Sequence, residues 1–385
     1  MSRIYLDWNA TAPMCREALA AMTERLGLTG NASSVHGEGR AGRNVVETAR
    51  REVARLVNAP ENGVIFASCG TEAIATALTP YWRVAGEKTQ LCGALVGATE
   101  HAAAQAGGRF PVEARSRLAV DRAGLIDLEA LAGQLRAASG PILVAVQAAN
   151  NETGVIQPVA DIAALVHAQN GVFICDAVQA AGRMPLDIEA IGADGLILSG
   201  HKLGGPQGTG ALILRDEMTV PEPLIGGGGQ EMGRRAGTEP VAAIAGFGAA
   251  ARLVGEELEE VPARLLALRE KLEAELRARI PGVVIFGGNA PRLVNTTLIG
   301  FEGAPAATLL MALDLSGFAV SSGAACSSGK VKRSHVLDAM GIERSLAESA
   351  IRVSFGRDTG EAELIGFAEG FEKAAKCLYR RANAA

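Results

Sequence analysis

Several features that define other classes of protein are missing from this chain of 385 residues. No run of about 20 apolar residues indicates a membrane-spanning helix. The start, "MSRIYLDWNATAP", has no apolar stretch of the signal-peptide kind. No tract of lysine and arginine dominates, and the formal net charge is −5, so the composition argues against a nucleic acid partner. We therefore expect a cytoplasmic protein that does not act at a membrane.

Cysteine is scarce as well, and its spacing excludes another class. The chain has 6 cysteines, and no two of them are spaced as Cys-x-x-Cys. This argues against a zinc site of the common kind. In a cytosolic protein of this size, free thiols are the default state of cysteine. We also see no internal repeat and no low-complexity segment.

The chain does contain a regular alternation of strand-like and helix-like stretches. Apolar runs are followed by helix-like segments such as "CGTEAIATAL" and "VADIAALVHAQ". This alternation predicts an α/β fold with a mostly parallel sheet covered by helices on both faces. The character changes near residue 255, where a long charged amphipathic stretch begins. We predict a large domain over 15–255 and a smaller α+β domain formed by 1–14 and 256–385. The strand-like runs lie at 64–68, 91–98, 141–149, 171–176, 194–200 and 210–215.

Polar side chains follow five of these strand-like runs at the point where each run ends. In an open parallel sheet, ligands bind beyond the carboxyl ends of the strands, which meet at one edge. Solvated loops could explain any one of these groups, but five together favour a site. The segments are Cys69–Glu72, Thr99–His101, Asn150–Glu152, Asp176 with Gln179, and Ser199–Lys202.

The residue types at this edge predict one particular cofactor. A partly desolvated amine, here that of Lys202, has a lowered pKa and can form a Schiff base. The carboxylate of Asp176, at the end of an apolar strand, needs a cationic partner such as a protonated ring nitrogen. Thr71 at a helix start, with Ser199 and His201, offers donors to a phosphate. Together these groups fit pyridoxal 5′-phosphate, which has an aldehyde, a ring nitrogen and a phosphate.

Each of these residues also has a plainer interpretation. A lone lysine such as Lys202 is usually solvated in a turn. Asp176 could serve only as the N-cap of the following helix, and His101 could only cap a helix or pack. Gln179 could be solvated, and Thr71 could be an ordinary first-turn residue. The grouping of these residues at one sheet edge, rather than any single residue, favours the cofactor site.

A second reactive residue is predicted in the segment "AVSSGAACSSGKVKRSH", residues 319–335. Cys326 lies there among small residues with several lysine, arginine and histidine residues nearby. An exposed, electropositive setting favours the thiolate, although a buried structural cysteine is the commonest alternative. Farther on, Arg352 in "SAIRVSFGR" could hold a substrate carboxylate with two parallel hydrogen bonds. Arg357 and surface ion pairs compete with this interpretation.

The motifs of the chain resemble those of a known family from end to end. The segments "YLDWNATAP", "GNASSVH", "SCGTEA", "TEHAA", "NNETGVIQP", "DAVQAAG", "SGHKLGGPQGTGAL", "GGGGQEMGRRAGTEP", "SSGAACSSG" and "SAIRVSFGR" carry the resemblance. They resemble the cysteine desulfurases of aminotransferase class V, in the nitrogen-fixation and iron–sulfur assembly group. The resemblance implies a pyridoxal-phosphate enzyme of fold type I that forms a homodimer. It implies conversion of L-cysteine to L-alanine, with sulfur passed to an iron–sulfur scaffold or another acceptor protein.

The resemblance also implies a role for each site residue. Lys202 would form the Schiff base, His101 would stack on the ring and act as acid and base, and Cys326 would become a persulfide. No resident metal is implied, and Cys326 would at most be a transient shared iron–sulfur ligand. Asp176 would pair with the ring nitrogen, and Gln179 would bond the ring hydroxyl. Gly70, Thr71, Ser199 and His201 would bind the phosphate, Thr238 would reach it from the other subunit, Asn151 would lie by cofactor and substrate, and Arg352 with Asn31 would hold the substrate carboxylate.

Three positions depart from the family pattern, and two other functions stay open. Cys69 stands where glycine is usual, Ala32 where proline is common, and Met232 where arginine is frequent. A different class V enzyme, such as a transaminase or a selenocysteine lyase, would keep Lys202 and Asp176 without needing Cys326. A non-catalytic sulfur-transfer partner would retain only the fold. The sequence does not decide the physiological sulfur acceptor.

Overall fold

The computed structural model describes residues 3–322 and 333–382. Its main feature is a seven-stranded sheet in the order β2-β10-β9-β8-β7-β5-β6. Only β10 runs antiparallel to its neighbours, so β2, β9, β8, β7, β5 and β6 all point the same way. The strands are β2 (Val64–Ala67), β5 (Ala94–Gly97), β6 (Arg115–Leu118), β7 (Leu143–Gln147), β8 (Val172–Asp176), β9 (Gly195–Ser199) and β10 (Gly210–Leu214).

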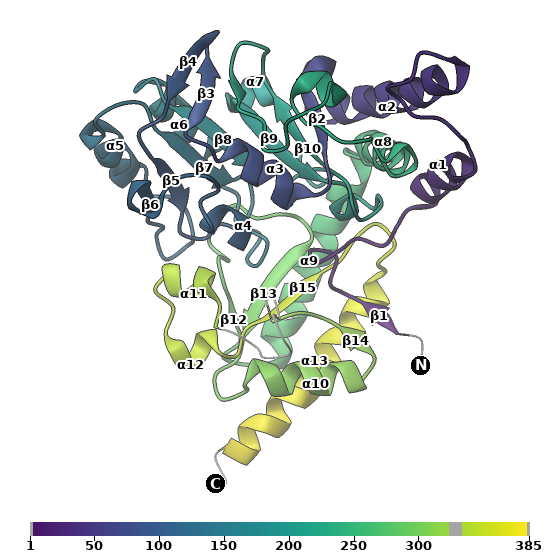
Figure 1. The fold of residues 1–385 in the computed structure, drawn as a ribbon. Coiled ribbons are helices and arrows are strands. Elements are labelled where there is room, and N and C mark those ends of the chain that lie inside the picture. The colour runs from purple at the N-terminus through teal and green to yellow at the C-terminus, as the bar shows by residue number, and fades with distance from the viewer. Residues whose placement is uncertain (1–2, 323–332, 383–385) are drawn as a thin grey trace.

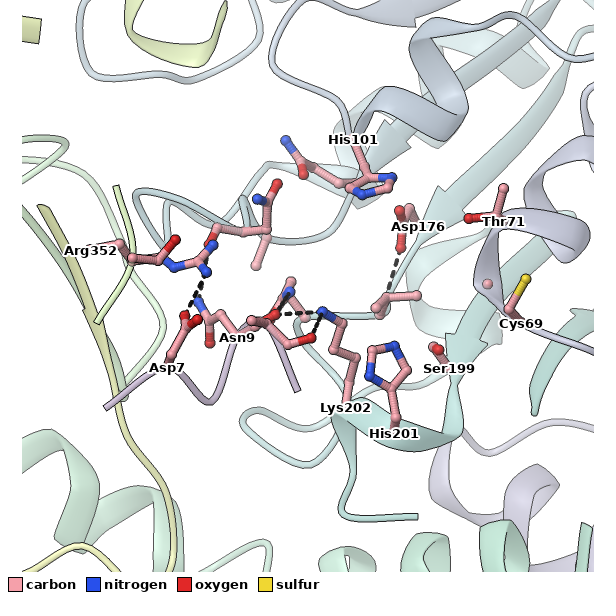
Figure 2. Close-up of a pocket in the computed structure, with 18 of the residues that line it drawn as sticks. Asp7, Asn9, Cys69, Thr71, His101, Asp176, Ser199, His201, Lys202 and Arg352 are labelled. Atoms are coloured by element: carbon pink, nitrogen blue, oxygen red, sulfur yellow. Dashed lines mark hydrogen bonds and ion pairs between the residues drawn. The ribbon is translucent and has the colours of Figure 1, made fainter. Parts of the chain in front are cut away.

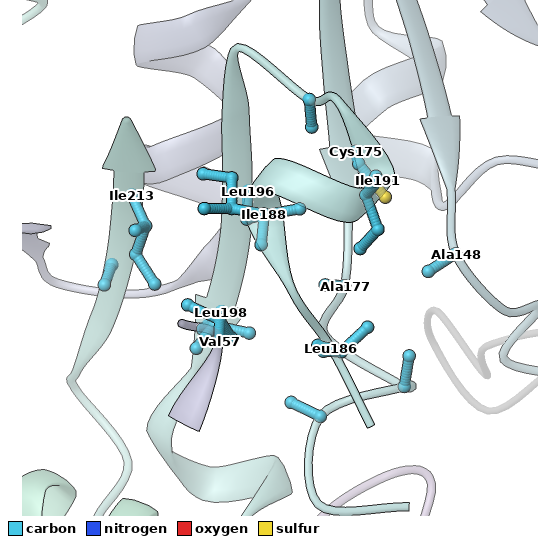
Figure 3. Close-up of a cluster of buried hydrophobic side chains, with 14 of the residues drawn as sticks. Val57, Ala148, Cys175, Ala177, Leu186, Ile188, Ile191, Leu196, Leu198 and Ile213 are labelled. Atoms are coloured by element: carbon cyan, nitrogen blue, oxygen red, sulfur yellow. The ribbon is translucent and has the colours of Figure 1, made fainter. Parts of the chain in front are cut away.

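The central strands are apolar because both of their faces are buried. Leu196 and Leu198 of β9 pack into one core together with Ile188 (Figure 3). Ile197, between them, points to the opposite face and packs into another core. Successive side chains of a strand alternate between the faces of a sheet, so a strand covered on both sides reads as a continuous apolar run. The predicted α/β fold with a mostly parallel sheet is confirmed.

Helices cover the two faces of the sheet unequally. The first core takes residues from six helices, and the second takes residues mainly from α3, α4 and the β3–β4 hairpin. Helices α2 and α8 approach closely because Gly248 has no side chain. A Cβ there would lie 2.5 Å from the Cα of Ala49. The six helices of the first core are α2 (Gly37–Leu56), α5 (Leu128–Ala137), α6 (Val159–His167), α7 (Ile188–Ile191), α8 (Val241–Glu256) and α1 (Arg16–Leu26), which packs against α8.

The elements of the second face and its rim are shorter. Helices α3 (Gly70–Ala77) and α4 (Ala102–Gln105) start directly after strand ends. A separate antiparallel sheet consists of β11, β3 and β4. Its strands are β3 (Tyr81–Val84), β4 (Glu87–Gln90) and β11 (Val220–Pro221), and the 3₁₀ turns are η1 (Glu61–Gly63), η2 (Val112–Ala114), η3 (Gly200–Lys202) and η4 (Gln230–Gly233).

The C-terminal part of the chain builds a third core, which also takes up the N-terminal segment (Figure 1). Leu6 and Trp8 are buried there against residues such as Leu272, Phe355 and Phe367. No helix in residues 3–322 and 333–382 has the length and apolar character needed to cross a membrane. The strands are β1 (Ile4–Tyr5), β12 (Val284–Ile285), β13 (Thr296–Gly300), β14 (Phe318–Ala319) and β15 (Ile351–Ser354), and the helices are α9 (Glu260–Arg279), α10 (Ala306–Leu315), α11 (His335–Ala339), α12 (Arg344–Ala347) and α13 (Glu361–Ala382).

Candidate active site

A cavity of about 620 Å³ lies at the carboxyl ends of the parallel strands (Figure 2). Strands β2, β5, β7, β8 and β9 point toward it, because all of them run in the same direction in the sheet. The cavity brings together most of the residues that the sequence singled out. Its lining includes Gly70, Thr71, His101, Asn151, Asp176, Gln179, Ser199, His201, Lys202 and Arg352.

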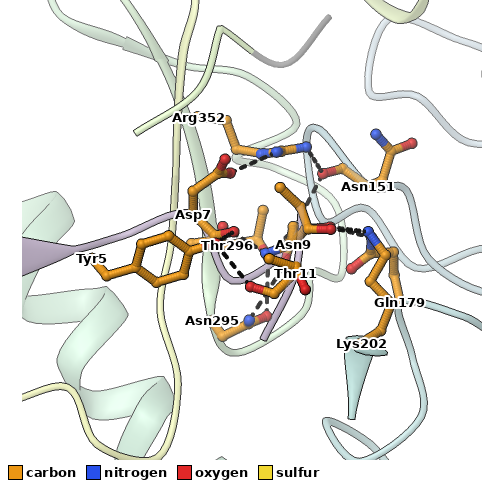
Figure 4. A network of polar contacts seen from close by, with 12 residues as sticks. Tyr5, Asp7, Asn9, Thr11, Asn151, Gln179, Lys202, Asn295, Thr296 and Arg352 are labelled. Carbon is orange, nitrogen blue, oxygen red and sulfur yellow. Dashed lines mark hydrogen bonds and ion pairs between the residues drawn. The ribbon is translucent and has the colours of Figure 1, made fainter. Parts of the chain in front are cut away.

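Lys202 lies in the short turn η3 that follows β9. Burial lowers its pKa from the usual 10.5 to about 7, and the nearby Arg352 and Arg183 act in the same direction. Its Nζ donates hydrogen bonds to the carbonyl oxygens of Asn9 at 2.5 Å and Ala10 at 2.7 Å (Figure 4). A lysine with its pKa lowered this far gives up its proton much more readily than an ordinary lysine, so its amine can act as a nucleophile.

Asp176 ends β8 and lies across the cavity from Lys202. Burial raises the pKa of its carboxyl group. The Val178 N–H, which donates to Oδ1 at 3.0 Å, and the nearby His101 and Lys202 oppose this rise. A buried carboxylate in this position is stabilised by any additional cationic group that enters the cavity.

His101 follows β5 and caps α4. Its Nδ1 accepts a hydrogen bond from the Ala103 N–H at 3.2 Å. Burial lowers the pKa of the imidazole, and Asp176 opposes that effect. The neutral ring therefore carries its proton on Nε2, because Nδ1 acts as an acceptor. Nε2 is the atom through which this ring can exchange a proton with a ligand.

Donors suited to an anion gather at the start of α3. Cys69, the N-cap residue, makes no side-chain hydrogen bond to the first turn, so the first N–H groups lack that partner. Thr71 and Ser199 line the same end of the cavity. His201 is neutral at pH 7, since burial first and Lys202 second lower its pKa to about 4. A helix N-terminus with nearby hydroxyl groups is a suitable site for a phosphate.

A glycine lets two strands meet behind this anion site. Gly210 begins β10, which pairs with the end of β2. A Cβ at Gly210 would lie 2.4 Å from the backbone carbon of Cys69 and 2.7 Å from the nitrogen of Gly70. The glycine-rich segment after Lys202 thus allows the chain to re-enter the sheet directly behind the turn that leads into α3.

Arg352 on β15 closes the opposite end of the cavity. Its Nη2 bonds Oδ1 of Asp7 at 2.8 Å, and its Nη1 donates to the carbonyl oxygen of Asn151 at 2.9 Å. Within the described part of the chain, Nε is buried and has no hydrogen-bond partner. The guanidinium group is therefore fixed in place and still has N–H groups to offer a carboxylate.

Three predicted site residues are not placed in this cavity. Asn31 and Thr238 are exposed and do not line it within the single chain. Asn31 instead accepts a hydrogen bond from the Ser33 N–H at 2.8 Å. Cys326 lies outside the described residues. On either side of the undescribed segment, Ser321 lines the cavity and His335 Nε2 bonds the carbonyl oxygen of Glu100 at 2.8 Å.

The three departures from the family pattern lie in different settings. Cys69 lines the cavity at the start of α3. Ala32 is buried, whereas Met232 is exposed and has a left-handed backbone with φ of 57°.

N-terminal residues for which the sequence predicts no role also reach the site. Asp7 and Asn9 line the cavity, and Gln179 Nε2 bonds the carbonyl oxygen of Asn9 at 3.0 Å. Asn9 is buried, and its side chain donates to Asn151 O and Thr296 Oγ1 (Figure 4). The motif "YLDWNATAP" was the available signal, since it places an acid and an amide in an otherwise ordinary N-terminal segment.

The sheet and the groups at its strand ends define the class of protein: an α/β protein of the pyridoxal-phosphate fold type I. The profile of the family described as aminotransferase class-V matches residues 4–366. A cysteine desulfurase of Cereibacter sphaeroides is 40% identical over 377 residues, covering 94% of this chain and 93% of that protein. The chain therefore belongs to the class V aminotransferase family, in the cysteine desulfurase group.

Solved structures agree with this placement. The X-ray structure of a NifS-like protein from Rickettsia africae matches with a TM-score of 0.87 and 33% identity, covering 97% of this chain and 99% of that one. A structure described as SspA in complex with cysteine matches with a TM-score of 0.74 and 27% identity, covering 92% of this chain and 99% of that one.

Proposed function

We propose that this chain is a pyridoxal-phosphate-dependent cysteine desulfurase that converts L-cysteine to L-alanine and transfers the sulfur to Cys326. One observation carries the proposal. A lysine with its pKa lowered to about 7 lies in a cavity between a buried acid, Asp176, and an arginine with free N–H groups, Arg352. This arrangement offers a nucleophilic amine, a partner for a ring cation and a clamp for an amino acid carboxylate.

The residues present fit pyridoxal 5′-phosphate. Lys202 would hold its aldehyde carbon, Asp176 its ring nitrogen, and Thr71, Ser199 and His201 its phosphate. The N–H groups at the start of α3 lack a side-chain cap, which supports an anion at that end. When bound, the cofactor supplies an electron sink that makes bonds at the substrate's α and β carbons labile. Gln179 and Asn151 would bond polar groups of cofactor and substrate from the cavity wall.

The chain's own residues would bind the substrate and move its protons. Arg352 would hold the α-carboxylate through N–H groups that Asp7 and Asn151 leave free. Lys202, once its amine is free, and His101, through Nε2, would take and return protons. The Cys326 thiolate would attack the substrate sulfur and form an S–S bond while the carbon–sulfur bond breaks. The electron pair of that bond stays with the carbon, which takes a proton to give alanine, so one cysteine and one thiol yield one alanine and one persulfide.

The described residues that flank Cys326 support this role. Ser321 pairs with Arg352 through two backbone hydrogen bonds of 2.7 and 3.2 Å. On the other side, Ser334 Oγ donates to Oε2 of Glu152 at 2.6 Å. Both ends of the segment that carries the cysteine are therefore attached beside the substrate clamp. The persulfide would then pass to an acceptor protein, and we propose an iron–sulfur scaffold as one such acceptor.

We further propose a cytoplasmic homodimer in which Thr238 and Asn31 act across the interface. Both residues are exposed in the single chain and stand apart from its own cavity, which is compatible with a role toward a second copy. Gel filtration with light scattering tests the dimer. Complementation between a Thr238→Ala chain and a Lys202→Ala chain tests the shared site, because mixed dimers would keep one intact site.

The decisive experiment measures alanine and sulfide formed from L-cysteine by wild type and Cys326→Ala. We expect the variant to bind pyridoxal phosphate normally, with its visible absorbance band, and to lose sulfide formation. Sulfide formation that survives the change would favour a class V enzyme of another kind. Failure of the wild type to take up the cofactor would favour a non-catalytic sulfur-transfer partner. Cys377→Ala is a matched control, because that thiol is exposed on α13.

A further inference from the structure

Asp7 and Arg352 form an ion pair within the cavity wall. Asp7 Oδ1 lies 2.8 Å from Nη2 of Arg352, and both residues line the cavity (Figure 4). The side chain of Arg352 is 6% exposed and that of Asp7 is 20% exposed. The N-terminal segment thus places an acid directly against the predicted substrate clamp on β15.

The backbone around Asp7 holds this acid in position. Asp7 forms an isolated parallel bridge with Ser354, at the end of the strand that carries Arg352. The next residue, Trp8, donates from its N–H to the carbonyl oxygen of Ser354 at 3.1 Å. The Tyr5 hydroxyl donates to the carbonyl oxygen of Asp7 at 3.1 Å. These contacts fix the backbone of Asp7 beside β15, at a position from which its carboxylate reaches Arg352.

Acidic and basic side chains are unevenly placed in this cavity. Among the described residues that line it, the carboxylates are Asp7 and Asp176, and the cations other than histidine are Lys202 and Arg352. Figure 2 shows Asp176 beside Thr71 and His101, at a distance from the end where Asp7 meets Arg352. Asp7 thus neutralises the one guanidinium group that faces the cavity at the clamp end.

The remaining N–H groups of Arg352 suffice for one further carboxylate. A guanidinium group has five N–H donors. The Asn151 carbonyl oxygen and Asp7 use one donor each, and Nε is buried without a partner in the described ranges. A ligand with a single carboxylate can accept from the free edge. A second carboxylate on the ligand side chain would be repelled by Asp7, and among the lining residues that the structure describes, Lys202, the predicted Schiff-base lysine, is the remaining cation other than histidine.

We propose that Asp7 is a specificity-determining residue that positions Arg352 and restricts the site to amino acids with one carboxylate, against dicarboxylic ones. The inference rests on the proposed function, because it assumes that Arg352 holds the substrate carboxylate. The pKa of Lys202 also reflects the opposing charges of Asp7 and Arg352. Asp7 raises the pKa of Lys202, whereas Arg352 lowers it, so the acid offsets the arginine's effect on the reactive amine.

The test compares two ligands that differ only in charge. L-Aspartate and L-asparagine have nearly the same shape, and their dissociation constants are measured with the cofactor-loaded enzyme by absorbance titration and calorimetry. The wild-type enzyme should bind L-asparagine more tightly than L-aspartate. Asp7→Asn should improve the binding of L-aspartate relative to L-asparagine by about tenfold, which corresponds to about 1.4 kcal/mol. Asp7→Glu, which keeps the charge, should restore a ratio near that of wild type.

Controls separate this role from a purely structural one. If Asp7 has only a structural role, Asp7→Asn should weaken the binding of both ligands equally. The ratio of the two dissociation constants would then be unchanged, which would overturn the inference. Asp358→Asn, at an exposed position away from the cavity, should leave the ratio as in wild type. In the cofactor-free chain, Asp7→Asn should move the midpoint of Lys202 acylation to lower pH, and an unmoved midpoint counts against the proposal. Failure to load pyridoxal phosphate would instead refute the proposed function.

Discussion

Arg50 and Glu231 form a buried, two-point ion pair that covers the outer edge of the large sheet. Arg50 Nη1 and Nη2 lie 2.8 and 3.0 Å from the two carboxylate oxygens. The pair also satisfies the free edge of β2. Arg50 donates to the carbonyl oxygen of Val64 at 2.6 Å, and Glu231 accepts from the Phe66 N–H at 2.8 Å. Two side chains thus take the place of a neighbouring strand.

This pair connects two predicted parts of the site. Strand β2 leads directly into Cys69 and the start of α3. Glu231 has a left-handed backbone with φ of 46°, which is strained for a residue other than glycine. Beyond it, Arg235 bonds both carboxylate oxygens of Glu72 on α3, at 2.9 and 3.2 Å. The segment that presents Thr238 is therefore attached to the anion site at two places.

We expect Glu231→Gln to lower the free energy of unfolding by roughly 3–5 kcal/mol, because it removes the buried carboxylate that balances the buried Arg50 charge and leaves only the half-exposed Glu47 beside it. Urea unfolding followed by circular dichroism measures the loss. Glu47→Gln is a matched control, since Glu47 contacts the same guanidinium at 3.1 Å but is 45% exposed. That variant should lose less than about 1 kcal/mol. Equal losses in both variants would contradict the edge-covering role.

Gly210→Ala should weaken pyridoxal phosphate binding while the sheet still forms. The added Cβ would meet the backbone of Cys69 at 2.4 Å, so the turn that leads into α3 must shift. Overpacking of this kind costs roughly 1–3 kcal/mol, which corresponds to about a tenfold to hundredfold loss if it falls on the phosphate contacts. Fluorescence titration of the cofactor-free chain gives the dissociation constant.

The control for this variant is Gly133→Ala, because a Cβ at Gly133 of α5 would meet no atom within 4 Å. Its affinity for the cofactor should match that of wild type. If Gly210→Ala also retained full affinity, the close approach of β10 would have no bearing on the anion site.

The sequence predicted the site residues whose positions follow from the direction of the strands. It missed the residues that reach the site through contacts between segments far apart in the sequence. Asp176 ends β8, and Lys202 and His101 closely follow β9 and β5. The shared direction of those parallel strands is enough to bring the three residues to one edge. Asp7 reaches Arg352 across a sequence separation of 345 residues, with no periodic pattern to reveal the contact. Thr238 and Asn31 lie outside the cavity of one chain. The role predicted for Thr238 involves a second chain, which no single sequence pattern positions, and we propose that the same holds for Asn31.

The stability of the cofactor-free protein should rise with pH between about 7 and 10.5 because of Lys202. Burial, together with Arg352 and Arg183, lowers the pKa of this amine from 10.5 to about 7 in the folded chain. In that window the unfolded chain holds a proton that the folded chain has released. Since the unfolded state binds more protons, the free energy of unfolding increases with pH. The cost of burying the charged amine is fully present below pH 7.

Lys202→Met removes this contribution, so the difference in melting temperature between wild type and variant should grow in favour of wild type as the pH rises through the window. Lys373→Met, at an exposed position on α13, should follow the wild-type curve. Parallel curves for wild type and Lys202→Met would show that the amine titrates alike in both states.

Ser334→Ala should destabilise the segment that follows the predicted sulfur-accepting cysteine. Ser334 Oγ accepts from the Leu337 N–H at 3.1 Å, which caps α11, and donates to the buried Glu152 at 2.6 Å. Burial already raises the pKa of Glu152, and the serine lowers it, so loss of the hydroxyl group raises that pKa further. A lost cap costs about 1 kcal/mol and an unpaired buried acceptor about 1–3 kcal/mol. Ser334→Thr keeps the hydroxyl group and should retain most of the stability.

If the segment also positions Cys326, Ser334→Ala should slow persulfide formation from L-cysteine, measured in a single turnover by alkylation and mass spectrometry. Unchanged persulfide formation despite lower stability would limit Ser334 to a structural role.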